Sequence, residues 1–83
     1  MEKILVFKST TCGPCKMLTP VLERVQSEIE LDITEYYIDQ SDEARDYAMS
    51  YGVSSVPTIV KPDTMETLVG LRRKKDIVEW LSA

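Results

Sequence analysis

The arrangement of the chain follows from one stretch near its start, Lys3-Ile4-Leu5-Val6-Phe7-Lys8-Ser9-Thr10-Thr11-Cys12-Gly13-Pro14-Cys15. Its first six residues form an apolar run between two lysines, which predicts a central strand buried on both faces. The residues from Thr10 to Pro14 predict a turn that opens a helix, because proline suits a first helical turn, where its missing N–H costs nothing. The two cysteines are therefore expected where a buried strand gives way to a helix.

The elements after this stretch alternate in type. Hydrophobic periodicity and turn residues predict further strands over 33–38, 56–60 and 65–69 and helices over 42–50 and 74–81. Ser41 is the expected N-cap of the second helix, and the last helix is expected to bury Ile77, Trp80 and Leu81. The order strand-helix-strand-helix-strand-strand-helix predicts an α/β fold, a four-stranded mixed sheet flanked by three helices.

Length and charge restrict the class of protein. A chain of 83 residues is expected to form a single domain over 1–83. The formal net charge of -4 favours neither nucleic acid nor an anionic membrane as a partner. The start of the chain has too few apolar residues for a signal peptide, which predicts a cytoplasmic protein. We expect it to be a monomer.

The pair Cys12 and Cys15 carries the expected chemistry. The first-turn N–H groups and the dipole of the helix favour a thiolate at this position, and the spacing allows a disulfide that opens without unfolding the protein. Cys12 is expected to be exposed and Cys15 half-covered. A zinc site needs four ligands, and this chain supplies two thiolates and no histidine, so a metal site would require two copies sharing it.

Several segments together resemble the thioredoxin family. Thr11 to Leu18, followed by Pro20, is similar to the family's active-site segment. Tyr51-Gly52-Val53 followed by Val56-Pro57-Thr58 resembles the segment that contains its cis-proline, and Val69-Gly70 resembles the glycine that faces the active site. The resemblance covers nearly the whole chain and implies a thioredoxin-like fold.

The resemblance also implies an activity and a set of site residues. It implies that Cys12 attacks disulfides in proteins, that Cys15 resolves the mixed disulfide, and that no cofactor is needed. The implied partners are a thioredoxin-reductase-like enzyme and disulfide-containing targets such as ribonucleotide reductase. The residues implied to contact substrate flank the cysteines and the cis-proline: Thr11, Gly13, Pro14, Val56, Pro57 and Gly70.

Two positions depart from the family pattern. Val6 replaces the usual buried aspartate, and Thr11 replaces the usual tryptophan before the first cysteine.

The roles of several residues and the function itself have alternatives. Lys8 is either solvated or a thiolate partner, and the basic run 72–75 is either a solvated surface or a docking site. The alternatives to a general reductase are a glutaredoxin-like redoxin, one dedicated to ribonucleotide reductase, a binding subunit without redox activity, and a dimeric zinc protein.

Overall fold

Strands and helices follow the predicted order in the computed structural model, which describes residues 2–83. Each of the seven expected elements is present. In chain order they are β1 (Glu2–Lys8), α1 (Gly13–Gln26), β2 (Leu31–Tyr37), α2 (Asp42–Ser50), β3 (Thr58–Lys61), β4 (Glu66–Val69) and α3 (Lys74–Ser82). The α/β prediction of a four-stranded sheet with three helices is confirmed.

The sheet is mixed, with strand order β2-β1-β3-β4. β1 pairs in parallel with β2 and antiparallel with β3, and β3 pairs antiparallel with β4. The first pair is parallel because α1 carries the chain back across the sheet, whereas a short turn between β3 and β4 forces an antiparallel pair. β1 is therefore central, as its continuous apolar run predicted.

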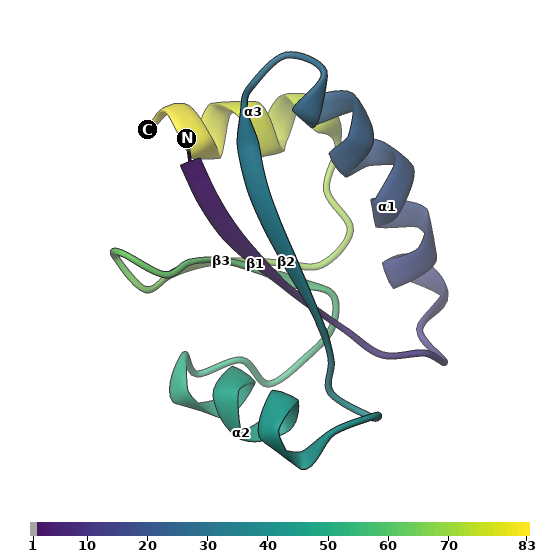
Figure 1. Cartoon of the computed structure of the whole chain (residues 1–83). Helices are drawn as coiled ribbons and strands as arrows, with labels where there is room; N and C mark the ends of the chain where they lie inside the picture. The colour runs from purple at the N-terminus through teal and green to yellow at the C-terminus, as the bar shows by residue number, and fades with distance from the viewer. Residues whose placement is uncertain (1) are drawn as a thin grey trace.

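Alternate residues of β1 feed two separate cores, because successive side chains of a strand point to opposite faces. Ile4 and Val6 pack with buried residues of α1 and α3, including Leu22. Leu5 and Phe7 pack on the other face with Ala48 of α2. Figure 1 shows the same division, with α1 and α3 on one side of the sheet and α2 on the other.

Some predicted boundaries shift by one or two residues. β2 begins at Leu31 and ends at Tyr37, whereas residues 33–38 were expected. β3 begins at Thr58 instead of residue 56, because Pro57 has no N–H to donate to a neighbouring strand. β4 begins one residue late because Met65 has a φ of 63° and closes the preceding turn, its N–H donating to the Lys61 carbonyl at 2.8 Å.

The ends of the helices show how the chain handles its charges. The Ser41 hydroxyl accepts a hydrogen bond from the Ala44 N–H at 3.2 Å, so the predicted N-cap is confirmed. The basic run 72–75 reaches the unfavourable N-terminus of α3. Part of its charge is paired there, because Arg73 contacts Asp76 at 3.3 Å and Lys74 contacts Glu28.

Trp80 lies at the edge of the core and not inside it. Its side chain is only partly buried and packs against the core on the α1 and α3 side of the sheet. The buried Lys61 places its Nζ 4.6 Å from the centre of the indole ring and donates to the Trp80 carbonyl at 2.7 Å. The indole therefore covers a lysine as well as apolar residues, which the apolar spacing of the helix did not predict.

Candidate active site

The loop between β1 and α1 is anchored by an aspartate that follows β2. The Thr10 N–H donates to both carboxylate oxygens of Asp39, at 3.1 and 3.0 Å, and the Thr10 hydroxyl donates to the same carboxylate. These hydrogen bonds, led by the one from the hydroxyl, hold the pKa of Asp39 below its usual value. Because β1 and β2 are parallel, their ends meet here, and Asp39 fixes where the cysteine-bearing turn begins.

Cys12 is the N-cap of α1. Its backbone is extended, with φ -90° and ψ 111°, and its Sγ accepts a hydrogen bond from the Cys15 N–H at 3.1 Å. Pro14 lies in the first turn, where it leaves no N–H unsatisfied. The sulfur therefore occupies the place of a capping oxygen, at the positive end of the helix dipole, where negative charge is favoured.

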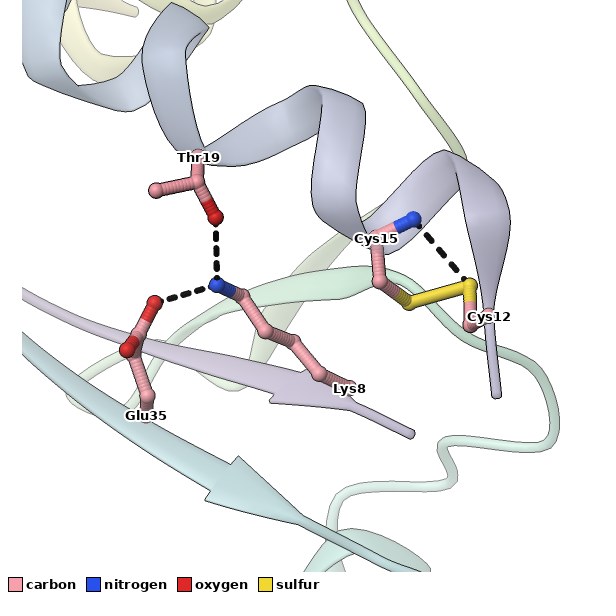
Figure 2. A network of polar contacts seen from close by, with 5 residues as sticks. All are labelled: Lys8, Cys12, Cys15, Thr19 and Glu35. Carbon is pink, nitrogen blue, oxygen red and sulfur yellow. Dashed lines mark hydrogen bonds and ion pairs between the residues drawn. A yellow bond between two sulfur atoms is a disulfide. The ribbon is translucent and has the colours of Figure 1, made fainter. Parts of the chain in front are cut away.

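Cys12 and Cys15 form a disulfide, with their Cα atoms 5.2 Å apart. Both are more covered than the sequence suggested: Cys12 is half-buried instead of exposed, and Cys15 is 2% exposed instead of half-covered. Cys12 remains the more accessible of the two. Figure 2 shows the pair at the start of α1, with Cys15 on the helix side.

The segment before β3 faces the disulfide. The Val56–Pro57 peptide bond is cis, as the resemblance implied. The Val56 carbonyl oxygen lies 3.8 Å from Cys12 Sγ, and Pro57 is buried. The Gly70 N–H donates to the Pro57 carbonyl at 2.8 Å, which ties the end of β4 to this segment. Three of the six residues expected around the substrate, Val56, Pro57 and Gly70, thus lie on two neighbouring segments. The other three, Thr11, Gly13 and Pro14, are exposed beside the cysteines.

The comparisons with known proteins agree with this geometry. Residues 1–83 match the family model described as Thioredoxin. The chain belongs to the thioredoxin family. Thioredoxin from Listeria monocytogenes is 40% identical over 81 residues, covering 92% of this chain and 76% of the relative. Thioredoxin from Rickettsia typhi is 31% identical over 84 residues, covering 95% and 77%.

Solved thioredoxin structures show the same fold. A mutant thioredoxin from Halobacterium salinarum superposes with a TM-score of 0.79 at 27% identity, covering 95% of this chain and 70% of that one. A thioredoxin from Aeropyrum pernix gives 0.76 at 25% identity, covering 95% and 71%. Family, fold and the cysteine pair together make the chain a thiol–disulfide oxidoreductase. Its family works with thioredoxin reductase and disulfide-containing targets. No helix within residues 2–83 has the length and apolarity to cross a membrane.

A pocket of about 260 Å³ opens beside Cys15, at the end of the thioredoxin sheet. Its lining residues come from β1, the following loop, α1 and β2: Lys8, Ser9, Thr10, Cys15, Lys16, Thr19 and Tyr37. Lys8 is only 3% exposed. Its ammonium donates to Thr19 Oγ1 at 2.9 Å and pairs with the Glu35 carboxylate (Figure 2). The structure therefore excludes the solvated reading of Lys8.

The two departures from the thioredoxin pattern have different surroundings. Val6 is fully buried on the face of β1 that packs against α1, so an apolar side chain fills the place of the family's buried carboxylate. Thr11 is exposed, and its N–H donates to the Ser9 hydroxyl at 3.2 Å. Thr11 therefore shapes the loop through a local hydrogen bond and leaves a small polar side chain exposed beside Cys12.

Gly70 should tolerate alanine poorly, whereas Gly13 should accept it. Gly70 has a φ of 89°, in the left-handed region where a Cβ is unfavourable, so Gly70→Ala should lower the free energy of unfolding by about 1 kcal/mol. Gly13 begins α1 with no atom near its missing side chain, and Gly13→Ala should be neutral or stabilising. Urea unfolding of both variants provides the measurement, and equal midpoints would contradict the expectation.

Proposed function

We propose that this chain is a general protein-disulfide reductase in which Cys12 is the nucleophile and Cys15 the resolving thiol. The observation that carries the assignment is the unequal placement of the sulfurs. Cys12 is the accessible N-cap, where the helix dipole favours its thiolate, whereas Cys15 is 2% exposed. A substrate sulfur can therefore approach Cys12, and the Cys15 sulfur is held ready behind it.

The proposed cycle is a pair of thiol–disulfide exchanges. The Cys12 thiolate attacks one sulfur of the substrate disulfide, forms a mixed disulfide and releases the other sulfur as a thiolate, which takes up a proton. Cys15 then loses its proton, and its thiolate attacks Cys12 Sγ. The bond to the substrate breaks, the second substrate sulfur leaves as a thiolate, and the Cys12–Cys15 disulfide remains. Two electrons have passed to the substrate, and the chain needs no bound cofactor for these steps.

The proposed substrate site lies along the segment before β3. Within residues 2–83, no group accepts a hydrogen bond from the Val56 N–H, which supports pairing with an extended substrate backbone. No atom lies near the position that a Cβ on Gly70 would take, so a substrate chain has room beside this glycine. Thr11, Gly13 and Pro14 would form the exposed rim around Cys12.

We propose a thioredoxin-reductase-like enzyme as the electron source, with ribonucleotide reductase among the possible targets, in a cytoplasmic monomer. Gly70 is followed by Leu71-Arg72-Arg73 instead of the second glycine and acidic residue usual in glutaredoxins. Gly-Pro between the cysteines also departs from the glutaredoxin pattern of Pro-Tyr. Both features support a protein reductant over glutathione.

Reduction of insulin disulfides should be supported by thioredoxin reductase with NADPH and only weakly by glutathione with glutathione reductase. The protein is the same in both assays, so the comparison isolates the source of electrons. A variant in which Cys12 and Cys15 are both serine serves as the background. Equal rates with the two sources, or a faster rate with glutathione, would replace the proposal with a glutaredoxin-like function.

A further inference from the structure

Lys8 is a buried cation beneath the helix that carries Cys15, with its ammonium directed toward Thr19 and Glu35. It is the last residue of β1 and, with Cys15, lines the 260 Å³ pocket. Figure 2 shows its side chain running beneath α1, with Thr19 over the ammonium and the cysteine pair at the start of the same helix. Burying an ammonium is costly unless it is paired, so this position requires partners.

The partners of Lys8 hold its ammonium in a fixed place. Thr19 accepts one hydrogen bond at 2.9 Å, and the Glu35 carboxylate forms the ion pair. The two charges are not equally buried: the side chain of Lys8 is 4% exposed and that of Glu35 is 40% exposed. Water therefore weakens the field of the carboxylate more than that of the ammonium, and Glu35 is absent from the lining of the Cys15 pocket.

Other charged and titratable groups surround the pocket from each element packed there. Lys16 of α1 is exposed, and Tyr37 of β2 lines the pocket. Asp39 is engaged by Thr10 at the start of the loop, and Glu23 of α1 lies beside Glu35 in a separate surface depression. Of the groups that line the pocket, Lys8 combines a full charge with near-complete burial.

We propose that the Lys8 ammonium promotes ionisation of Cys15 in the resolving step, and that Glu35 and Thr19 are the positioning residues that hold it there. The proposal rests on the proposed function, in which Cys15 resolves the mixed disulfide. The family's buried carboxylate is absent because Val6 fills its place. A fixed positive charge assists differently from a carboxylate: it stabilises the thiolate and accepts no proton.

The proton balance of the step is then explicit. The Cys15 thiol gives its proton to water in the pocket, and the thiolate that remains is stabilised by the ammonium of Lys8. The thiolate attacks Cys12 Sγ, the Cys12–Cys15 bond forms, and the substrate sulfur leaves with the electron pair of the broken bond. Lys8 keeps its proton throughout, so its charge is the same before and after the step.

Lys8→Met should move the pH midpoint of the resolving step upward by about one unit, because an opposite charge beside a thiol favours its ionised form. At neutral pH the resolving rate should fall about threefold. Lower ionisation alone would cost about tenfold, but a more basic thiolate is also a better nucleophile and recovers part of this loss. Lys8→Arg keeps the charge and should retain most of the wild-type profile.

Glu35→Gln provides a test of opposite sign. Removing the carboxylate leaves the Lys8 charge less compensated, so the midpoint should move downward. If Glu35 instead accepted the Cys15 proton, the same variant would slow resolution and raise the midpoint. The two mechanisms therefore predict opposite shifts from one substitution.

Stopped-flow reduction of a small aromatic disulfide from pH 5 to 9 separates attack by Cys12 from resolution by Cys15. Ultraviolet titration of the Cys15 thiolate, with each substitution combined with Cys12→Ser, measures the pH midpoint of Cys15 ionisation directly. Lys61→Met is the matched control, because Lys61 is also buried but binds the Trp80 carbonyl, and its midpoint should match wild type.

Three outcomes are decisive, provided that urea unfolding shows folded variants. The proposal is supported if the pH midpoint of the resolving step rises in Lys8→Met, stays the same in Lys8→Arg and falls in Glu35→Gln. An unchanged midpoint in Lys8→Met, or an upward one in Glu35→Gln, overturns it. Failure of the wild-type protein to show a first step at Cys12 would instead overturn the proposed function.

Discussion

Cys12→Ser should abolish turnover in the insulin assay, with a loss on the order of a thousandfold, down to the background rate. A serine hydroxyl is not ionised near neutral pH and does not displace a thiolate from a disulfide, so the first exchange cannot occur. Serine is close to cysteine in size, and Cys12 lies at the half-buried start of α1, where a hydroxyl is a good N-cap. The loss should therefore be chemical and leave the fold intact.

Cys15→Ser should block turnover at a different point. Cys12 can still attack, but the variant has no second thiolate to resolve the mixed disulfide. A covalent complex with the substrate should therefore accumulate. Mass spectrometry of each variant incubated with a model disulfide measures this difference. Accumulation in Cys15→Ser and none in Cys12→Ser is expected. The reverse pattern would exchange the roles of the two cysteines.

The central features of the fold could be predicted from short-range patterns. Five consecutive buried residues in β1 require cover on both faces, and the turn chemistry from Thr10 to Pro14 fixes where α1 begins. The order of the elements then leaves few topologies, because the first crossover is right-handed and the last pair is a hairpin. The cysteine pair could be located for the same reason, since it lies at the junction of strand and helix.

The ion pair of Lys8 could not be predicted, because its partners are distant in the sequence. Lys8 ends an apolar run, which is a common place for a solvated residue. Two facts together place it inside: it points to the same face as Val6, and parallel pairing of β1 with β2 brings Glu35 opposite Val6. The register of two strands is a tertiary property, and a single sequence gives it only weakly.

The hydrogen bonds between Asp39 and Thr10 also depend on the register of β1 and β2. Asp39 follows the second strand in the sequence, but nothing in the residues around it shows that its carboxylate binds Thr10. The signal that existed was the adjacency of the ends of two parallel strands. This adjacency predicts which loops are neighbours, but the individual hydrogen bonds between them depend on how both segments pack.

Val6→Asp should be the most destabilising of the substitutions considered, lowering the free energy of unfolding by about 3 kcal/mol at neutral pH. Val6 is 0% exposed and packs among side chains of α1, β3 and α3. Its neighbours in register are Ile59 and Glu35, so a new carboxylate would gain an apolar partner on one side and a like charge on the other. Both raise the cost of ionisation.

The pH dependence of this loss has a definite sign. Burial should raise the pKa of the introduced aspartate in the folded state above the ordinary value of about 3.9 that it has when unfolded. The folded variant therefore favours the protonated form. Relative to wild type, it should be least destabilised below the unfolded pKa and lose stability as pH rises toward the folded pKa. Urea unfolding at pH 4 and pH 7 measures the difference.

Val6→Asn is the matched control, because asparagine is nearly the same size as aspartate and stays neutral. It should carry the cost of a buried polar group without the pH dependence. At pH 7 the aspartate variant should therefore unfold at lower urea concentration, and at pH 4 the two midpoints should converge. Lys8 lies two residues along on the same face, and pairing with it would stabilise an ionised Asp at this position. Equal midpoints at pH 7 would show that the ammonium is free to do so, which would contradict an ammonium held by Glu35 and Thr19.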